Sequence, residues 1–110
     1  IKAMILSGGE NIYPAEVESG IMGCLGVADI AVIGVPDEKW GEAVKALVVP
    51  SADLHPDPDD IIAWARERIA AYKVPKSVDF IDALPRNPSG KVLRRELRAP
   101  YWEGRGRAVG

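Results

Sequence analysis

Lys91 is the residue whose type and position most directly suggest chemistry in this sequence. It ends the segment PRNPSGK (residues 85–91), in which two prolines and a glycine favour a tight loop. Lysine is charged at neutral pH, and a stiff loop that presents its ammonium suits binding of a phosphate or a developing anion. An ordinary solvated turn lysine is the alternative, because so short a motif often occurs by chance.

Basic residues gather around this loop, although the formal net charge of the 110-residue chain is −2 at pH 7. That net charge argues against a dedicated nucleic-acid-binding protein. The basic residues of the segment 86–107 are Arg86, Lys91, Arg94, Arg95, Arg98, Arg105 and Arg107, and its acids are Glu96 and Glu103. The segment is either a solvated surface or one that meets phosphates.

Trp40 is a second candidate for binding because it lies in a polar segment, residues 37–42. An exposed indole there would be a platform for a flat heterocycle, whereas an indole folded back over a sheet would be a packing residue. The chain lacks the glycine patterns of dinucleotide-binding and Walker A loops. Its one histidine, His55, has no Cys or His partner nearby, so we expect neither a metal site nor a nucleophilic triad.

The elements expected to position these residues form a small α+β domain. Gly8 and Gly9 predict the turn of an N-terminal β-hairpin with strands around residues 4–6 and 11–13. Apolar runs at residues 30–35, 44–49 and 78–81 predict a sheet of about three strands. Two to three packed helices are expected, over residues 14–23, 57–72 and 93–98. In the second, Asp57 is the predicted cap, and Ile61, Ala65, Ile69 and Tyr72 are the predicted buried face.

Composition describes one ordinary globular domain, with 47% hydrophobic and 27% charged residues. The single cysteine, Cys24, cannot form an internal disulfide and fits a reducing, cytoplasmic setting. No apolar run approaches the roughly 18 residues of a membrane span, and no secretory signal is visible. The chain begins at Ile1 within an apolar stretch, so we expect it to be a piece of a longer protein.

Four blocks of the sequence, in order, resemble the small C-terminal domain of acyl-CoA synthetases, which are adenylate-forming ligases. The blocks are MILSGGENIYPAEVE (4–18), VPDEKWGE (35–42), YKVP (72–75) and LPRNPSGKVLRR (84–95). The resemblance implies that residues 1–110 are a lid domain whose large N-terminal ATP- and acyl-binding domain is absent. It also implies a reaction in which a carboxylic acid and ATP form an acyl-adenylate and pyrophosphate, after which coenzyme A displaces AMP.

The resemblance assigns roles to individual residues. Lys91 matches the adenylation lysine, and the residues that match the coenzyme A site are Gly8, Gly9, Trp40, Tyr72 and Lys73. Lys2 and Ala3 fall at the hinge, where the family usually has a charged or polar residue in place of Ala3. Val74 stands where some relatives carry a phosphate-binding arginine.

Three functions remain open. The first is the mobile lid of an AMP-forming ligase for a fatty or aromatic acid, which would use ATP, coenzyme A and Mg²⁺ and would pack against its own N-terminal domain. Mg²⁺ and most ATP contacts would lie in that absent domain, so the isolated chain should fold but not catalyse ligation. The second is a freestanding nucleotide or acyl-carrier binding module, which the length of the native reading frame would distinguish.

The third is the lid of another adenylate-forming enzyme, one that loads a carrier protein. The Gly-Gly-Glu-Asn block favours coenzyme A over a carrier protein. The acid itself is not specified, because acyl pockets of this family lie in the large domain.

Overall fold

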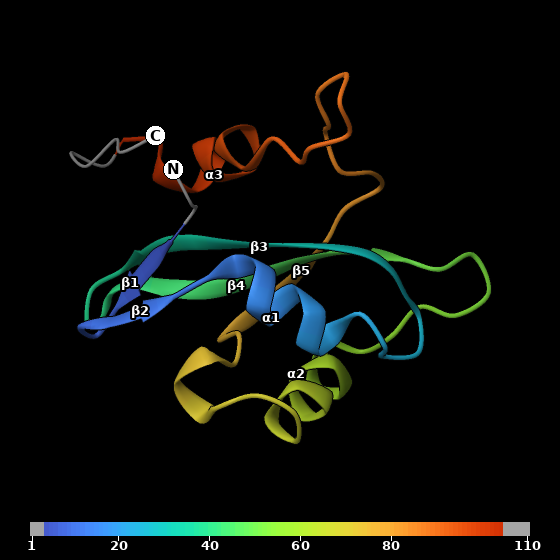
Figure 1. Ribbon diagram of the computed structural model, residues 1–110, viewed down its shortest axis with the longest axis horizontal. Coiled ribbons are helices and arrows are strands. Elements are labelled where there is room, and N and C mark those ends of the chain that lie inside the picture. The colour runs from blue at the N-terminus through green and yellow to red at the C-terminus, as the bar shows by residue number, and fades with distance from the viewer. Residues whose placement is uncertain (1–3, 105–110) are drawn as a thin grey trace.

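The computed structural model describes residues 4–104, which form one five-stranded sheet with helices on both faces (Figure 1). The elements are β1 (Ile5–Ser7), β2 (Glu10–Ile12), α1 (Pro14–Ile21), β3 (Val27–Asp37), β4 (Gly41–Pro50), α2 (Pro58–Arg66), a 3-10 helix (Ala71–Lys73), β5 (Ser77–Phe80) and α3 (Arg94–Trp102). The predicted α+β class is confirmed. Among the described residues, no helix has both the length and the hydrophobicity needed to cross a bilayer.

The sheet is larger than the three strands expected, because the N-terminal hairpin joins it. The strand order is β2-β1-β4-β3, and β1 meets β4 where Ser7 pairs with Gly41. On the same side of β4, further along that strand, β5 pairs in parallel from Lys45–Ser77 to Val48–Phe80. A parallel pair needs a crossover connection, and the segment that contains α2 supplies it.

Strands β3 and β4 form a long antiparallel hairpin at the centre of the domain, with a register that runs from Val27–Pro50 to Asp37–Gly41. Both strands are longer than predicted: β3 starts at Val27 and runs past Pro36, and β4 starts at Gly41 and includes Pro50. Pro36 is tolerated because β3 is an edge strand, where one row of backbone N–H groups has no ladder partner.

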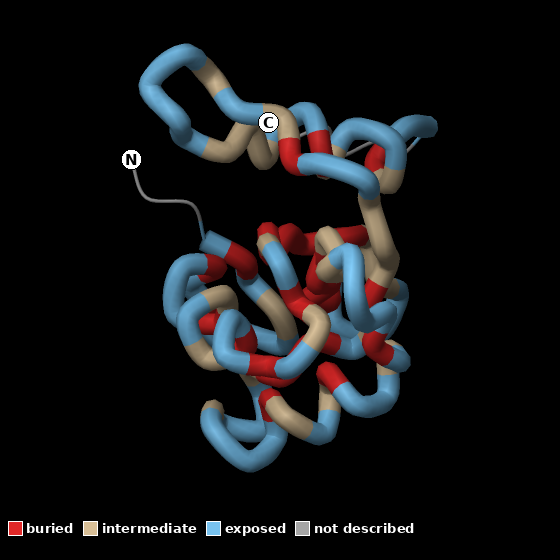
Figure 2. Tube along the Cα trace, turned by 90° about the vertical axis from the view of Figure 1, so that its right-hand side faces the viewer, coloured by how far each residue is buried: buried red, intermediate tan, exposed pale blue. Residues whose placement is uncertain are grey.

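Two hydrophobic cores lie on opposite faces of the sheet. Ile30 and Val32 face α1 and α2, whereas Ala31 and Ile33 face α3. Because both faces are covered, the strands read as continuous apolar runs rather than alternating patterns. Figure 2 shows the buried residues along the layer between the helices, with exposed residues on the outer turns.

The second helix differs most from expectation. It starts at Pro58 as predicted, but Asp57 makes no side-chain capping hydrogen bond. Ile61 and Ala65 are buried as predicted, yet the helix ends at Arg66 and not at Tyr72.

Packing against α1 explains this early end. The Cγ2 atom of Ile69 lies 2.6 Å from where a Cβ on Gly20 would be, so the chain docks closely on α1. Tyr72 then falls in a separate 3-10 helix with 44% of its surface exposed, and its predicted burial was wrong.

The other two helices lie close to their predicted positions. α1 begins at Pro14 and ends at Ile21, two residues earlier than Gly23. α3 begins at Arg94 but continues to Trp102, past the short helix expected. The extension follows from burial, because Trp102 is 7% exposed and its Nε1–H donates to the Gly34 carbonyl at 2.8 Å.

Candidate functional site

Lys91 lies on an exposed loop that is closed by an isolated antiparallel bridge between Arg86 and Val92. Asn87 organises the loop, since its Oδ1 accepts from the N–H of Ser89 at 3.0 Å, the Ser89 hydroxyl at 2.8 Å and the N–H of Lys91 at 2.9 Å. Within residues 4–104, the Lys91 ammonium has no hydrogen bond or ion pair. The predicted loop is confirmed, and its lysine charge faces solvent.

Both ends of this loop are tied to the body of the domain by arginines. Arg86 donates from Nη2 to Asp29 Oδ2 at 2.7 Å and from Nη1 to the Gly90 carbonyl at 2.8 Å. On the other side of Lys91, the Nη2 of Arg94 donates to both carboxylate oxygens of Glu18, at 2.8 and 2.7 Å. The sequence showed these arginines only as members of a basic segment.

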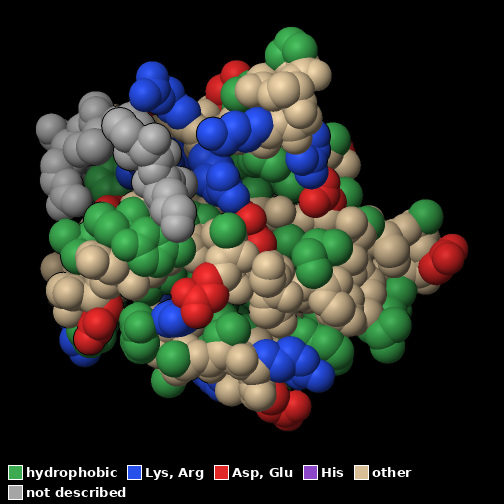
Figure 3. All heavy atoms as spheres, viewed as in Figure 1, with side chains coloured by type: hydrophobic (Ala, Val, Ile, Leu, Met, Phe, Trp, Pro, Cys, Tyr) green, Lys and Arg blue, Asp and Glu red, His purple; other side chains and the backbone are tan. Residues whose placement is uncertain are grey.

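Much of the predicted positive charge is therefore paired. Figure 3 shows Lys and Arg side chains gathered over α3 and the loop before it. Three of the arginines have carboxylate partners: Arg86 with Asp29, Arg94 with Glu18, and Arg98 with Glu42 at 4.0 Å. The surface that remains for an anion is smaller than the residue count suggests, and Lys91 is part of it.

The two glycines of the N-terminal turn have different surroundings. Both have positive φ, +58° at Gly8 and +83° at Gly9, which favours glycine. The Gly8 N–H donates to the Trp40 carbonyl at 2.9 Å, and a Cβ on Gly8 would lie 2.6 Å from Trp40 Cε3. A Cβ on Gly9 would meet nothing within 4 Å, so that side of the turn is open to an approaching molecule.

Trp40 therefore combines the two environments considered for it. Its ring packs on the turn at Gly8, yet 39% of its surface is exposed. The ammonium groups of Lys39 and Lys76 lie 4.7 and 5.6 Å from the ring centroid. An exposed aromatic face flanked by two cations suits a stacked base that carries phosphates. Lys76 was missed, because only the β4–β5 pairing brings the start of β5 beside Trp40.

Tyr72 and Lys73, in the 3-10 helix, form a second aromatic and basic pair. The Lys73 ammonium lies 5.5 Å from the Tyr72 ring and 2.6 Å from Glu16 Oε2 on α1. The hydrogen bond to Glu16 raises the pKa of Lys73 above its ordinary value. Val74 next to them is 6% exposed and lies in the core, so that position presents no side chain to a phosphate.

Trp40, the Gly8–Gly9 turn, Lys39 and Lys76 are together called the aromatic cluster. The Lys91 loop and this cluster lie at opposite ends of the β3–β4 hairpin. Asp29, which holds the loop, pairs with Val49 near the end of the hairpin remote from its turn. Trp40 lies at the turn itself, and Figure 1 shows the orange loop and the blue β1–β2 turn well apart. The structure thus brings Gly8, Trp40 and Lys76 together, away from Lys91. The hinge candidates Lys2 and Ala3 lie outside the described residues.

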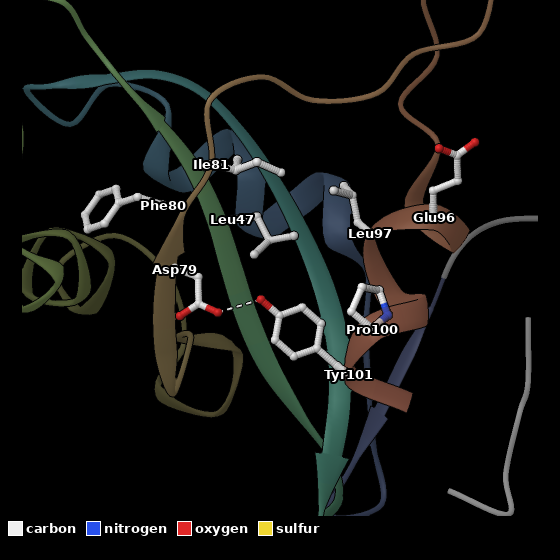
Figure 4. A pocket seen from close by; sticks show the side chains of 8 residues that line it. All are labelled: Leu47, Asp79, Phe80, Ile81, Glu96, Leu97, Pro100 and Tyr101. Atoms are coloured by element: carbon white, nitrogen blue, oxygen red, sulfur yellow. Dashed lines mark hydrogen bonds between the residues drawn. The ribbon is translucent and has the colours of Figure 1, made fainter. Parts of the chain in front are cut away.

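A pocket of about 510 Å³ lies between β5 and α3, apart from these candidates (Figure 4). In the wall of this pocket, the Tyr101 hydroxyl donates to Asp79 Oδ2 at 2.5 Å, and Lys45 Nζ lies 3.1 Å from the same oxygen. The Tyr101 hydrogen bond lowers the pKa of Asp79, while burial, together with Asp79, raises the pKa of Tyr101 to about 12. These polar groups satisfy one another and fasten α3 to the sheet.

Nothing in the described part of the chain resembles a metal centre. No group of three or more His, Cys, Asp or Glu side chains within residues 4–104 is placed to hold an ion.

Known proteins resemble this chain over most of its length. Residues 16–91 match the model of the AMP-binding enzyme C-terminal domain. A feruloyl-CoA synthase from Amycolatopsis sp is 58% identical over 101 residues, which are 92% of this chain and 21% of that protein. The fatty acid–[acyl-carrier-protein] ligase ScoC from Streptomyces coeruleorubidus is 49% identical over 109 residues, 99% of this chain and 21% of that protein.

A solved structure agrees with these matches. The Mycobacterium tuberculosis fatty acyl CoA synthetase superposes with a TM-score of 0.82 at 52% identity, covering 89% of this chain and 19% of that one. The chain thus spans about one fifth of the length of the relatives it matches. The match over residues 16–91 contains the blocks at 35–42 and 72–75 and overlaps the ends of the blocks at 4–18 and 84–95. The chain belongs to the AMP-binding enzyme C-terminal domain family, as the resemblance to the C-terminal domain of acyl-CoA synthetases implied.

Proposed function

We propose that this chain is the mobile C-terminal domain of an ATP-dependent acid–CoA ligase. In this proposal Lys91 serves formation of the acyl-adenylate, and the cluster around Gly8, Gly9 and Trp40 serves attack by coenzyme A. The observation that carries the proposal is the placement of these two sets at opposite ends of one β3–β4 hairpin. A single active site in a partner domain can meet both sets only in turn, so the domain must rotate between the two half-reactions.

The exposed ammonium of Lys91 suits the first half-reaction. Negative charge rearranges there between the acid carboxylate and the α-phosphate, and a positioned cation stabilises that rearrangement. The loop around Asn87 holds the backbone of Lys91 in place while leaving its side chain free to enter a partner domain.

The aromatic cluster suits the second half-reaction. The open side of Gly9 leaves room for a thin pantetheine arm, and the Trp40 face can stack on the adenine. Because Val74 is buried, the phosphates of coenzyme A would fall to lysines, with Lys39 and Lys76 beside Trp40 and Lys73 beside Tyr72.

The remainder of the enzyme supplies what this domain does not. The proposed partner is an N-terminal domain of the same protein, which binds the carboxylic acid, most of ATP and Mg²⁺. The isolated chain is accordingly inactive in ligation. The acid is aromatic or fatty, in keeping with the feruloyl-CoA synthase and fatty acyl CoA synthetase relatives.

Transfer to a carrier protein is the second candidate, favoured by the 49% identity to the acyl-carrier-protein ligase ScoC. The two candidates share the adenylation step and differ in the acceptor thiol. Free coenzyme A as a sufficient acceptor for the complete protein supports the first, and a requirement for a phosphopantetheinylated carrier supports the second.

Separate assays of the two half-reactions in the complete protein test the role of Lys91. Lys91→Ala is expected to slow acid-dependent ATP–pyrophosphate exchange by about 10²–10³-fold, since one preorganised electrostatic contact is worth about 2.7–4 kcal/mol. Attack of coenzyme A on supplied acyl-adenylate should be nearly unchanged. Arg95→Ala, which removes another exposed cation of the same segment, is the matched control. Equal losses in both half-reactions for Lys91→Ala would refute the assignment.

A further inference from the structure

We infer that Glu18 is a positioning residue for adenylation, acting through Arg94 on the loop that carries Lys91. The inference rests on the proposed function and adds to it a residue of α1 that lies on the other side of the sheet from α3. It follows from three observations: how Glu18 reaches Arg94, where this contact meets the Lys91 loop, and what holds the other end of that loop.

Glu18 links both faces of the domain around the edge of the sheet. Its two carboxylate oxygens accept from Arg94 Nη2, and its Oε2 also accepts from the backbone N–H of Val32 at 2.9 Å. Val32 lies in β3, the edge strand, whose outer N–H groups have no neighbouring strand. The carboxylate therefore joins α1, the edge of β3 and the first residue of α3, although Glu18 and Arg94 are 76 residues apart.

The contact between Arg94 and Glu18 is shielded enough from solvent to hold the start of α3 in place. The side chains of Arg94 and Glu18 are 23% and 18% exposed, and the pair is 2.7 Å apart. A partly buried charge pair that also satisfies a backbone donor is costly to break, because each charge would be left with poor solvation. The start of α3 is thereby held at the edge of β3.

Lys91 lies between this contact and a second one. Arg94 follows it by three residues, and Arg86, five residues before it, is held by Asp29 of the same strand. Two arginine–carboxylate contacts at the edge of β3 thus hold the two sides of a short loop, and Lys91 is the last residue of that loop before the bridge at Val92. If the Glu18 contact is lost, the loop, which stays closed by the Arg86–Val92 bridge, can turn as a unit about the Arg86–Asp29 contact, and the ammonium leaves its position relative to the sheet.

A small displacement is sufficient to matter for the reaction. Misplacement of a reacting or stabilising group by about 1 Å can cost on the order of 10²-fold in rate. Glu18 should therefore affect adenylation strongly, while leaving coenzyme A attack unchanged, because the aromatic cluster lies at the other end of the β3–β4 hairpin.

The test is a double-mutant cycle in the complete protein, with Glu18→Gln made in the natural background and in a Lys91→Ala background. Glutamine keeps an oxygen for the Val32 N–H but removes the charge that holds Arg94. Each variant is assayed for acid-dependent ATP–pyrophosphate exchange and for thioester formation from supplied acyl-adenylate. The assays use the acid that the unaltered protein activates fastest, chosen from a panel of fatty and aromatic acids that includes ferulate.

The expected result is a fall in exchange of about 10²-fold in the natural background and no further fall in the Lys91→Ala background, with thioester formation nearly unchanged. A purely structural Glu18 would cost the same in both backgrounds, and that result overturns the inference. An equal fall in both half-reactions also overturns it. If Lys91→Ala itself leaves exchange intact, the proposed function fails, and the inference fails with it.

Two further variants separate positioning from folding. Tyr101→Phe removes a contact that fastens the later part of α3 to β5 without touching the Lys91 loop, so it should lower stability and spare both half-reactions. Arg94→Lys keeps a charge for Glu18 but loses the planar guanidinium, and it replaces Glu18→Gln in the cycle if that variant does not fold. Arg94→Lys should lower exchange less than Glu18→Gln does, and this fall should likewise disappear in the Lys91→Ala background. A fall that persists there overturns the inference.

Discussion

Replacing Gly8 by alanine is expected to push the Trp40 ring away from the N-terminal turn, whereas the same change at Gly9 should not. The two glycines are adjacent and both have positive φ, so each alanine adopts a left-handed conformation. Only the Cβ at position 8 meets a neighbour, at 2.6 Å from Trp40 Cε3 and 3.0 Å from Cζ3. Gly9→Ala is therefore a matched control for the backbone strain.

The magnitudes follow from these distances. A left-handed conformation costs an L-residue about 1–2 kcal/mol, and both variants share this cost. Carbon atoms in good contact lie about 3.5–4.0 Å apart, so the Trp40 ring must move by about 1 Å to accept the new methyl group. Overpacking of this kind costs about 1–3 kcal/mol, and the lower end applies because the ring is 39% exposed and can shift outward. We expect Gly8→Ala to be the more destabilising of the two by about 1 kcal/mol.

Urea unfolding of the purified chain, followed by circular dichroism, measures this difference. Tryptophan fluorescence of the folded variants reports whether the ring has moved toward water. The decisive comparison repeats both substitutions in a Trp40→Ala background, where the clash is gone and the two alanines should cost the same.

Two outcomes would refute this reasoning. One is an equal loss of stability for Gly8→Ala and Gly9→Ala when Trp40 is present. The other is an excess cost at position 8 that persists after Trp40 has been removed. Either result would mean that the ring does not rest on the turn, and the proposed stacking surface beside Gly8 would lose its support.

Two other predictions concern pH and coenzyme A. The pKa of Tyr101 is raised to about 12, so its contribution to stability is complete below its ordinary value of 10.0 and is lost as pH rises through about 12. Tyr101→Phe should remove this part of the alkaline decline, measured as the urea midpoint at about pH 9 and about pH 11 in both proteins. In the complete protein, Trp40→Ala should raise the coenzyme A concentration needed for thioester formation, since stacking on an aromatic ring is worth about 1–3 kcal/mol per base. An unchanged requirement would make Trp40 a packing residue only.

Local chemistry in the sequence determined the elements that carry the candidate residues. Paired glycines predicted the turn at Gly8 and Gly9, and Pro14 marked the first residue of α1. The two prolines and Gly90 predicted the loop of Lys91, and the four family blocks pointed to the family that the comparisons confirmed. Such signals are reliable because turns and helix starts depend on the residues within a few positions of them.

Only the tertiary structure decided which residues meet. Arg94 and Glu18 were separate charges in the sequence, and packing of α1 and α3 on opposite faces of one edge strand brings them together. Lys76 reaches Trp40 because β5 lies parallel to β4, and Tyr72 is exposed because Ile69 docks on α1 and ends the helix early. Residue types and periodicity indicate which side of an element is buried but not what lies opposite, because contacts between distant segments depend on how those elements pack.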